Sequence, residues 1–212
     1  MKLKICGMKY PDNIREVAKF SPDFMGFIFY QQSKRFVGDD FVMPEISPGI
    51  AKVGVFVNDA LERILEKAAK YKLDYVQLHG GESPEFCKKV GNKVKVIKAF
   101  GLPCYSERNE ESFLFDSLAE YENCCEYFLF DTRTSEHGGS GKSFDRNILR
   151  NYQLSKPFFL SGGIDEADVA DLCIQTSVTK PFAIDVNSKF EIEPGLKDID
   201  KLKILIHELS GK

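Results

Sequence analysis

The sequence predicts an α/β protein built as one (β/α)8 TIM barrel, and three observations lead to this fold class. Eight short apolar segments alternate with segments of helical periodicity. Polar and glycine residues follow most of the apolar segments, at the end of the strands where barrel active sites lie. The chain of 212 residues is long enough for one barrel and contains no linker, repeat or low-complexity stretch. We therefore expect a single domain over residues 1–212.

The eight expected strands are joined by crossovers, because alternation with helices implies parallel pairing. An open doubly wound sheet is the alternative, but such a sheet more often has fewer strands and one switch point for its ligand. Polar residues after six of the eight strands favour the ring-shaped mouth of a closed barrel. In chain order the expected strands are Leu3–Cys6, Asp23–Phe29, Ala51–Val57, Tyr75–Gly81 with its exit, Lys93–Phe100, Phe128–Phe130, Pro157–Leu160 and Pro181–Val186.

The helices are predicted from capping residues and from apolar residues at 3.6-residue spacing. Asp39–Ile46 is the weakest candidate because Pro44 interrupts it. The others begin after Pro11, at a cap formed by Asn58 or Asp59, over Ser83–Val90, within Ser106–Tyr121, at Asp145, at Asp165 and over Asp198–Leu209.

Composition excludes several functional classes. A formal net charge of −3 gives no basic stripe for nucleic acid, so we expect no nucleic-acid partner. No apolar run approaches the roughly 20 residues that span a bilayer, and the N-terminus lacks the apolar core of a secretory signal. We expect a cytoplasmic protein without a membrane partner. Six cysteines without a C-x-x-C pair argue against a disulfide framework and a zinc site.

The most informative stretch is Phe128–Asp145. An apolar strand ends on Asp131, and a polar loop with three glycines leads to a capping residue at Asp145. A carboxylate at the end of a barrel strand, beneath a glycine-rich loop, is a candidate active-site acid. The alternative is that Asp131 only terminates the strand and binds loop amides.

Two turns near the end of the chain suit a phosphate group. Gly162-Gly163 follows the seventh strand, and Asp185-Val186-Asn187-Ser188 follows the eighth. Backbone amides at glycines and a helix N-terminus attract anions, and (β/α)8 barrels often hold phosphate after these two strands. Each turn alone could be only a tight turn.

Three further residues have a functional and a structural interpretation. Cys6 ends the first strand, with Lys4 on the same face, and could act as a base if its pKa is lowered; it could also be a small buried residue. Arg35, in Ser33-Lys34-Arg35, could clamp an anion or lie in a solvated charged run. His79 follows the fourth strand and could face the site or only line its rim.

The strand-end motifs together resemble phosphoribosylanthranilate isomerase, a family of tryptophan biosynthesis. The resemblance covers the full chain in order, with one departure: the family usually has a Ser-Ser-Gly-Val-Glu type of loop where this chain has Asn187–Glu191. The motifs are Lys4–Gly7, Gly26–Tyr30 with Ser33–Arg35, Gly54–Asn58, Val76–Gly80, Asp131-Thr132 with Gly138–Gly141, Leu160–Gly163 and Pro194–Asp198.

The resemblance implies an Amadori rearrangement of N-(5-phosphoribosyl)anthranilate, an aminoaldose phosphate, to the aminoketose. The family pattern makes Asp131 the acid that opens the ribose ring and Cys6 the base that removes the C2′ proton. Asp131 would need a raised pKa and Cys6 a lowered one. The loop between Thr132 and Lys142 is expected to close over the substrate.

The same resemblance implies the binding residues. Arg35 matches the grip on the anthranilate carboxylate, and amides near Gly162, Gly163, Asn187 and Ser188 would hold the phosphate. His79 and Asp185 complete the expected substrate-binding set. No metal, nucleotide or pyridoxal cofactor is implied, so the partner is a small phosphosugar carrying anthranilate.

Other interpretations remain open. A ribulose-phosphate epimerase would want metal-binding His and Asp at strand ends, and the chain has three histidines, one of them in a helix. An indole-glycerol-phosphate synthase would want lysine and glutamate inside the barrel, where only Lys98 is evident. A non-catalytic phosphate-binding barrel would not require both Cys6 and Asp131. We expect a monomer.

Overall fold

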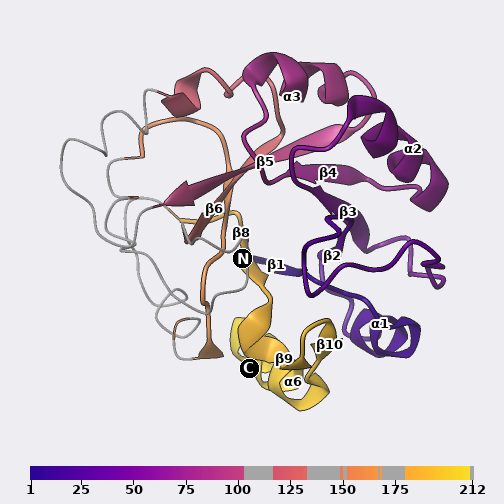
Figure 1. The fold of residues 1–212 in the computed structure, drawn as a ribbon. Helices are drawn as coiled ribbons and strands as arrows, with labels where there is room; N and C mark the ends of the chain where they lie inside the picture. The colour runs from indigo at the N-terminus through magenta and orange to yellow at the C-terminus, as the bar shows by residue number, and fades with distance from the viewer. Residues whose placement is uncertain (103–116, 133–148, 150–151, 167, 169–179, 211–212) are drawn as a thin grey trace.

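The computed structural model describes residues 1–102, 117–132, 149, 152–166, 168 and 180–210. Eight strands form a closed parallel barrel in chain order, with β8 pairing with β1, as Figure 1 shows. The predicted (β/α)8 fold class is therefore confirmed. The strands are β1 (Lys2–Ile5), β2 (Phe24–Ile28), β3 (Ala51–Phe56), β4 (Tyr75–Leu78), β5 (Lys95–Leu102), β6 (Tyr127–Thr132), β7 (Phe158–Leu160) and β8 (Ala183–Val186).

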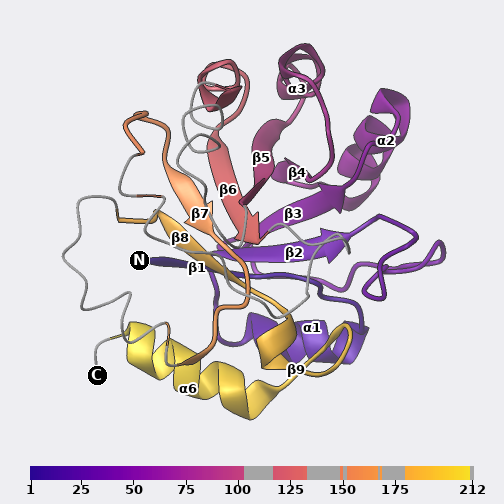
Figure 2. The same ribbon diagram turned by 60° about the vertical axis from the view of Figure 1, so that its left-hand side comes forward.

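The helices pack around the outside of this barrel. Figures 1 and 2 show α2 and α3 next to each other on one side and α1 and α6 together on another. Two of them begin with a residue suited to a helix start: Pro11 is the first residue of α1, and the side chain of Ser83 accepts from the Phe86 amide at the start of α3. Their bounds are α1 (Pro11–Ala18), α2 (Leu61–Tyr71), α3 (Pro84–Gly91) and α6 (Ile199–Leu209).

Three local predictions were wrong. Residues 39–46 are not helical, in keeping with Pro44, which lacks an amide to donate. The N-cap of α2 is Ala60, because Asn58 instead accepts a hydrogen bond from the Gly81 amide. Strand β6 ends at Thr132, one residue beyond the expected end at Asp131, and is paired with β5 up to that point.

Three predicted helices fall largely outside the described residues. Residues 117–119 of the Ser106–Tyr121 segment are helical, and the helix expected from Asp145 lies outside the described ranges. The cap expected at Asp165 is present, since its carboxylate accepts from the Asp168 amide while the Asp168 carboxylate accepts from the Asp165 amide. The cap at Asp198 is also confirmed, accepting from the amides of Asp200 and Lys201.

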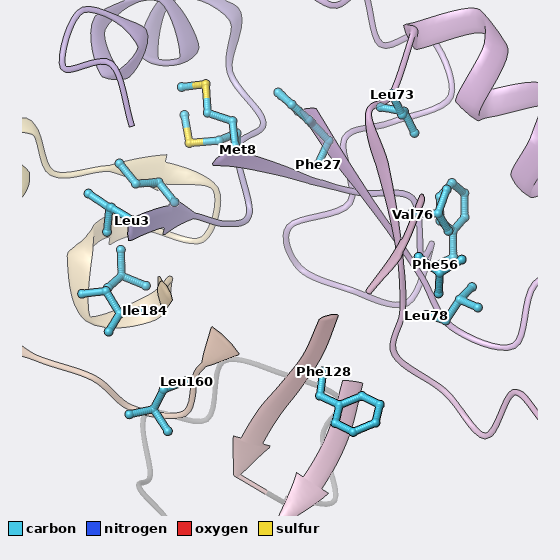
Figure 3. Close-up of a cluster of buried hydrophobic side chains, with 14 of the residues drawn as sticks. Leu3, Met8, Phe27, Phe56, Leu73, Val76, Leu78, Phe128, Leu160 and Ile184 are labelled. Atoms are coloured by element: carbon cyan, nitrogen blue, oxygen red, sulfur yellow. The ribbon is translucent and has the colours of Figure 1, made fainter. Parts of the chain in front are cut away.

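Strand alternation divides the apolar core into two layers. One layer lies between the strands and the helices, and Figure 3 shows part of it, including Phe27, Phe56 and Phe128. The other fills the barrel interior, where the rings of Phe24 and Phe159 meet edge to face at 5.0 Å. The interior layer contains Phe24, Val53, Ile97, Ala99, Leu129, Phe159 and Ala183.

A hairpin that was not predicted follows β8. A single 3₁₀ turn over Ser188–Phe190 leads into β9 (Glu191–Glu193) and β10 (Leu196–Lys197), an antiparallel pair. At the turn between them Gly195 has φ of +91°, a conformation that side chains other than glycine rarely adopt. Figure 2 shows this segment beside α1 and α6.

The hairpin is fixed by one carboxylate between two cations. Glu191 accepts from Arg35 Nε at 2.9 Å and Nη2 at 2.6 Å, and from Lys197 Nζ at 2.7 Å. Burial alone would raise the pKa of Glu191, but the hydrogen bonds from Arg35 and the charge of Lys197 outweigh it and hold that pKa below its usual value. The loop after β2 is thereby tied to the segment after β8.

We expect Phe159→Ala to lower the free energy of unfolding by about 3–5 kcal/mol, because it leaves a cavity in the barrel interior. Urea denaturation measures this loss. The matched control is Val42→Ala, at a side chain that is 76% exposed, which should change stability by less than about 0.5 kcal/mol. Equal effects of the two variants would contradict the interior packing.

We expect Glu191→Gln to destabilise the protein at neutral pH by roughly 3–5 kcal/mol, because it leaves Arg35 and Lys197 buried without their counter-charge. The lowered pKa of Glu191 means that its stabilisation is complete above the ordinary carboxyl pKa and is lost as pH falls through the lowered one. The difference in the free energy of unfolding between wild type and variant should therefore become smaller as the pH is lowered, which urea titrations at several pH values measure. Glu193→Gln, on the exposed end of the same hairpin, is the control; a pH-independent difference would contradict this account.

Candidate active site

A cleft opens at the carboxyl ends of the barrel strands. It encloses about 680 Å³, counting the space open to solvent. Eight of the nine residues expected at the site line this cleft, and Arg35 is the exception. The lining includes Cys6, His79, Asp131, Gly162, Gly163, Asp185, Asn187 and Ser188 together with Tyr30, Ser33, Gln77, Ser161 and Lys189.

The polar side chains reach the cleft because of strand parity. Inward positions near the start of the strands carry apolar side chains such as Leu129 and Ala183. Two residues further along the same strands, the inward positions are Asp131 and Asp185. The barrel interior is therefore apolar at one end and ionisable at the other.

Lys4 is the centre of this polar layer. Its ammonium is completely buried and donates to Asp185 Oδ2 at 2.8 Å and to Gln77 Oε1 at 2.7 Å. Its charge also acts on the nearby Cys6 side chain. Burial opposes the charged form, but Asp185 and Cys6 together raise the pKa of Lys4 above its usual value. Lys4 is thus a charged donor that links β1, β4 and β8.

Cys6 lies directly after β1 with its thiol in the cleft. Glycine in β2 makes room for it, since a Cβ at Gly26 would lie 2.7 Å from Cys6 Sγ. Burial raises the pKa of the thiol, and the positive charge of Lys4 opposes this without overcoming it. The lowered pKa expected of a base is therefore not present in this structure, because desolvation of the thiolate is the larger effect.

A second chain of contacts leads to Asp131. Gln77 Nε2 lies 2.8 Å from His79 Nδ1, and His79 Nε2 lies 3.4 Å from Asp131 Oδ2. His79 therefore faces the site, which agrees with the functional one of its two interpretations. Contacts of side chains therefore run from Asp185 through Lys4, Gln77 and His79 to Asp131, across the full width of the barrel.

Asp185 has one oxygen in use and one available. Oδ2 accepts from Lys4, whereas Oδ1 is buried and has no hydrogen-bond partner among the described residues. Burial raises the pKa of this carboxyl, partly offset by the charge of Lys4. An unpaired buried acceptor that lines a cleft is a feature that a donor group of a ligand would satisfy.

The two expected phosphate turns meet at one end of the cleft. Gly162 and Gly163 have φ of +90° and +63°, so both adopt the left-handed conformation that glycine tolerates best. Ser188 and Lys189 begin the 3₁₀ turn after β8 and line the same cleft. The turns that sequence could only place after two separate strands are therefore neighbours in space.

Arg35 lies beside the cleft and is 8% exposed. Its guanidinium is bound by Glu191, so it is not part of a solvated charged run. A Cβ at Gly7 would lie 2.8 Å from Arg35 Cδ and 2.6 Å from Asn187 Oδ1, which shows how closely these three residues pack. Lys197 donates to the same Asn187 oxygen at 2.8 Å.

Sequence reasoning missed Gln77, Glu191 and Lys197. Gln77 could have been found, because it lies two residues before His79 in a strand and so shares its face. Glu191 and Lys197 gave no such signal, since they approach Arg35 only through a hairpin that was not expected.

Among the described residues, no helix is long and apolar enough to cross a membrane.

The family model for N-(5'-phosphoribosyl)anthranilate (PRA) isomerase matches residues 3–208. The N-(5'-phosphoribosyl)anthranilate isomerase of Parabacteroides distasonis is 48% identical over 99% of this chain and 93% of its own, and that of Phocaeicola vulgatus is 42% identical over 100% and 99%. The crystal structure of the isomerase from Thermotoga maritima matches with a TM-score of 0.82 at 33% identity and covers both chains completely. The chain therefore belongs to the phosphoribosylanthranilate isomerase family.

Proposed function

We propose that this protein converts N-(5-phosphoribosyl)anthranilate to 1-(2-carboxyphenylamino)-1-deoxyribulose 5-phosphate in tryptophan biosynthesis. The observation that carries the proposal is that a thiol, a carboxyl group and the turns after β7 and β8 line one cleft of a chain of this family. A solved family structure contains the reduced form of that product, and it matches this chain with a TM-score of 0.77 at 30% identity over the full length of both.

The first step requires an acid, which we assign to Asp131. Its proton passes to the ribose ring oxygen, the bond from that oxygen to C1′ breaks, and a protonated Schiff base with the anthranilate nitrogen forms. Asp131 is 9% exposed and reaches the cleft from β6. A positioned acid of this kind contributes roughly 10²–10⁴-fold to rate.

The second step requires a base, which we assign to Cys6. The thiolate takes the proton from C2′, and the electron pair of that bond neutralises the iminium to give an enolamine, which tautomerises to the ketone. Cys6 reaches the cleft from β1, and in the barrel β7 and β8 lie between β1 and β6. A substrate in the cleft can therefore meet the acid and the base from different parts of the ring.

The remaining groups suit the rest of the substrate. Amides near Gly162, Gly163, Asn187 and Ser188 would hold the phosphate, and Asp185 Oδ1 would accept a hydrogen bond from a ribose hydroxyl. Arg35 would bind the anthranilate carboxylate with donors that Glu191 leaves available.

The chemistry uses only proton transfers, so the proposal includes no cofactor. We propose a cytoplasmic monomer, although one solved relative is a monomer generated from a dimeric isomerase of Thermotoga maritima.

The synthase alternative is disfavoured by the position of Lys98. Its ammonium binds Glu82 at 3.1 Å and the carbonyl oxygen of Gly80 at 2.7 Å, and it does not line the cleft. The epimerase alternative would need a metal site, and no group of three His, Cys, Asp or Glu side chains within the described ranges could hold one. A non-catalytic barrel remains the competing hypothesis.

We expect Cys6→Ala and Asp131→Ala each to lower kcat by roughly 10²–10⁴-fold, because each removes one proton-transfer group. The substrate is generated in place from anthranilate and phosphoribosyl pyrophosphate with the preceding transferase, and loss of its fluorescence is followed in the presence of a chelator. Because turnover requires a protonated Asp131 as well as the Cys6 thiolate, wild-type kcat/KM should pass through a maximum as pH rises. Cys124→Ala, at a cysteine outside the cleft, is the control; unchanged turnover in Cys6→Ala or Asp131→Ala would remove that residue from its role.

We expect Arg35→Lys to weaken binding of the reduced product analogue by roughly tenfold or more, because lysine lacks the planar fork that matches a carboxylate. Isothermal titration with the analogue and with inorganic phosphate separates the two ends of the site, and phosphate binding should change little. The control is Lys34→Arg, at the neighbouring exposed position. Equal weakening of both ligands by Arg35→Lys would place the effect in loop structure and contradict a carboxylate contact.

A further inference from the structure

We infer that Gln77 is a positioning residue that fixes which nitrogen of His79 carries the proton, so that His79 acts as a neutral hydrogen-bond donor to Asp131. The inference rests on the proposed role of Asp131 as the acid. It follows from consecutive contacts of buried or half-buried side chains, in which the chemistry of each donor and acceptor fixes the next.

The first contact sets the orientation of the Gln77 amide. Lys4 and Gln77 are 0% and 1% exposed, and their polar atoms lie 2.7 Å apart. A lysine ammonium has donors and no acceptor, so the amide oxygen must face Lys4. The reverse orientation would place the amide NH₂ against the ammonium, with two donors in contact.

The second contact sets the tautomer of His79. With its oxygen on Lys4, Gln77 presents its NH₂ to His79 Nδ1 at 2.8 Å. An amide NH₂ can only donate, so Nδ1 must accept and carries no proton. The proton of the neutral imidazole is therefore on Nε2.

The third contact directs the Nε2–H group of His79 toward Asp131. His79 Nε2 lies 3.4 Å from Asp131 Oδ2, and a hydrogen bond of about 2.9 Å would need only a small approach, as is common when catalytic contacts tighten around substrate. A neutral donor orients Oδ2 without adding a positive charge beside the carboxyl group. An imidazolium in the same place would favour the ionised carboxylate, which cannot act as an acid.

The charged groups around the His79 ring come from three other strands. Asp131 of β6 and Asp185 of β8 are acidic, and Lys4 of β1 is basic. The carboxylates alone would favour a doubly protonated ring. Gln77, oriented by Lys4, is the group in direct contact with Nδ1 that opposes this, since protonated Nδ1 would face the amide NH₂.

The first experiment is ¹⁵N NMR of the imidazole nitrogens in the ligand-free wild-type protein. At a pH where His79 is neutral we expect the proton on Nε2 and an unprotonated Nδ1. His207, exposed on α6, is the internal reference and should show both tautomers in rapid exchange. A proton on Nδ1 of neutral His79 would overturn the inference without any variant.

The second experiment is Gln77→Glu, which keeps an acceptor for Lys4 but replaces the NH₂ that faces Nδ1 by an acceptor. We expect both ring nitrogens of His79 to be protonated at a pH where the wild-type ring is neutral. Because an imidazolium favours ionised Asp131, kcat should decrease roughly tenfold or more while KM changes less than about threefold. The matched control is Gln153→Glu, the same change on the surface, which should leave the spectrum and kcat unchanged.

The third experiment separates the donor from the ring. His79→Gln can place an amide N–H near the position of Nε2, whereas His79→Leu cannot donate, so the glutamine variant should retain at least about tenfold more kcat. Equal kcat in the two variants, or an unaltered His79 spectrum in Gln77→Glu, would overturn the inference. Wild-type protein with the expected tautomer but no isomerase activity would instead contradict only the proposed function.

Discussion

The ammonium of Lys4 is the group on which the active end of the barrel depends. It is completely buried, it donates to Asp185 and Gln77, and its charge acts on Cys6. A buried charge is stable only when its partners satisfy it, and removal of one partner from such a pair costs roughly 3–5 kcal/mol. The positions of three strands around the cleft are therefore coupled through one side chain.

The same residue affects both proposed catalytic groups, by different routes. It acts on Cys6 through its charge, which opposes the rise in pKa caused by burial. It acts on Asp131 only through hydrogen-bond direction, since it orients Gln77 and so fixes the proton on His79. One buried lysine can thereby favour ionisation of the base without placing a positive charge against the acid, two requirements that a single cation near both groups could not meet.

The second cluster, in which Glu191 lies between Arg35 and Lys197, has a complementary role. It joins the loop after β2 to the hairpin after β8, and through Lys197 it also holds Asn187 at the edge of the cleft. In this chain the segment from Asn187 to Glu191 departs from the usual loop of the family. The retained Glu191 helps to fix that segment, because its carboxylate binds both Arg35 and Lys197.

Sequence by itself determined the barrel, because apolar periodicity and strand-end glycines are local signals, and it identified eight cleft residues, because parallel strands place their carboxyl ends together. It did not determine the end of β6, the Glu191 hairpin or the raised pKa of Cys6. Tertiary structure decided these: Asp131 stays in its strand because β5 pairs with it, Glu191 meets Arg35 because the segment after β8 lies near the loop after β2, and the Cys6 pKa reflects burial against nearby charge. Desolvation and long-range pairing depend on which residues surround a group in space, and the order of residues along the chain does not contain that information.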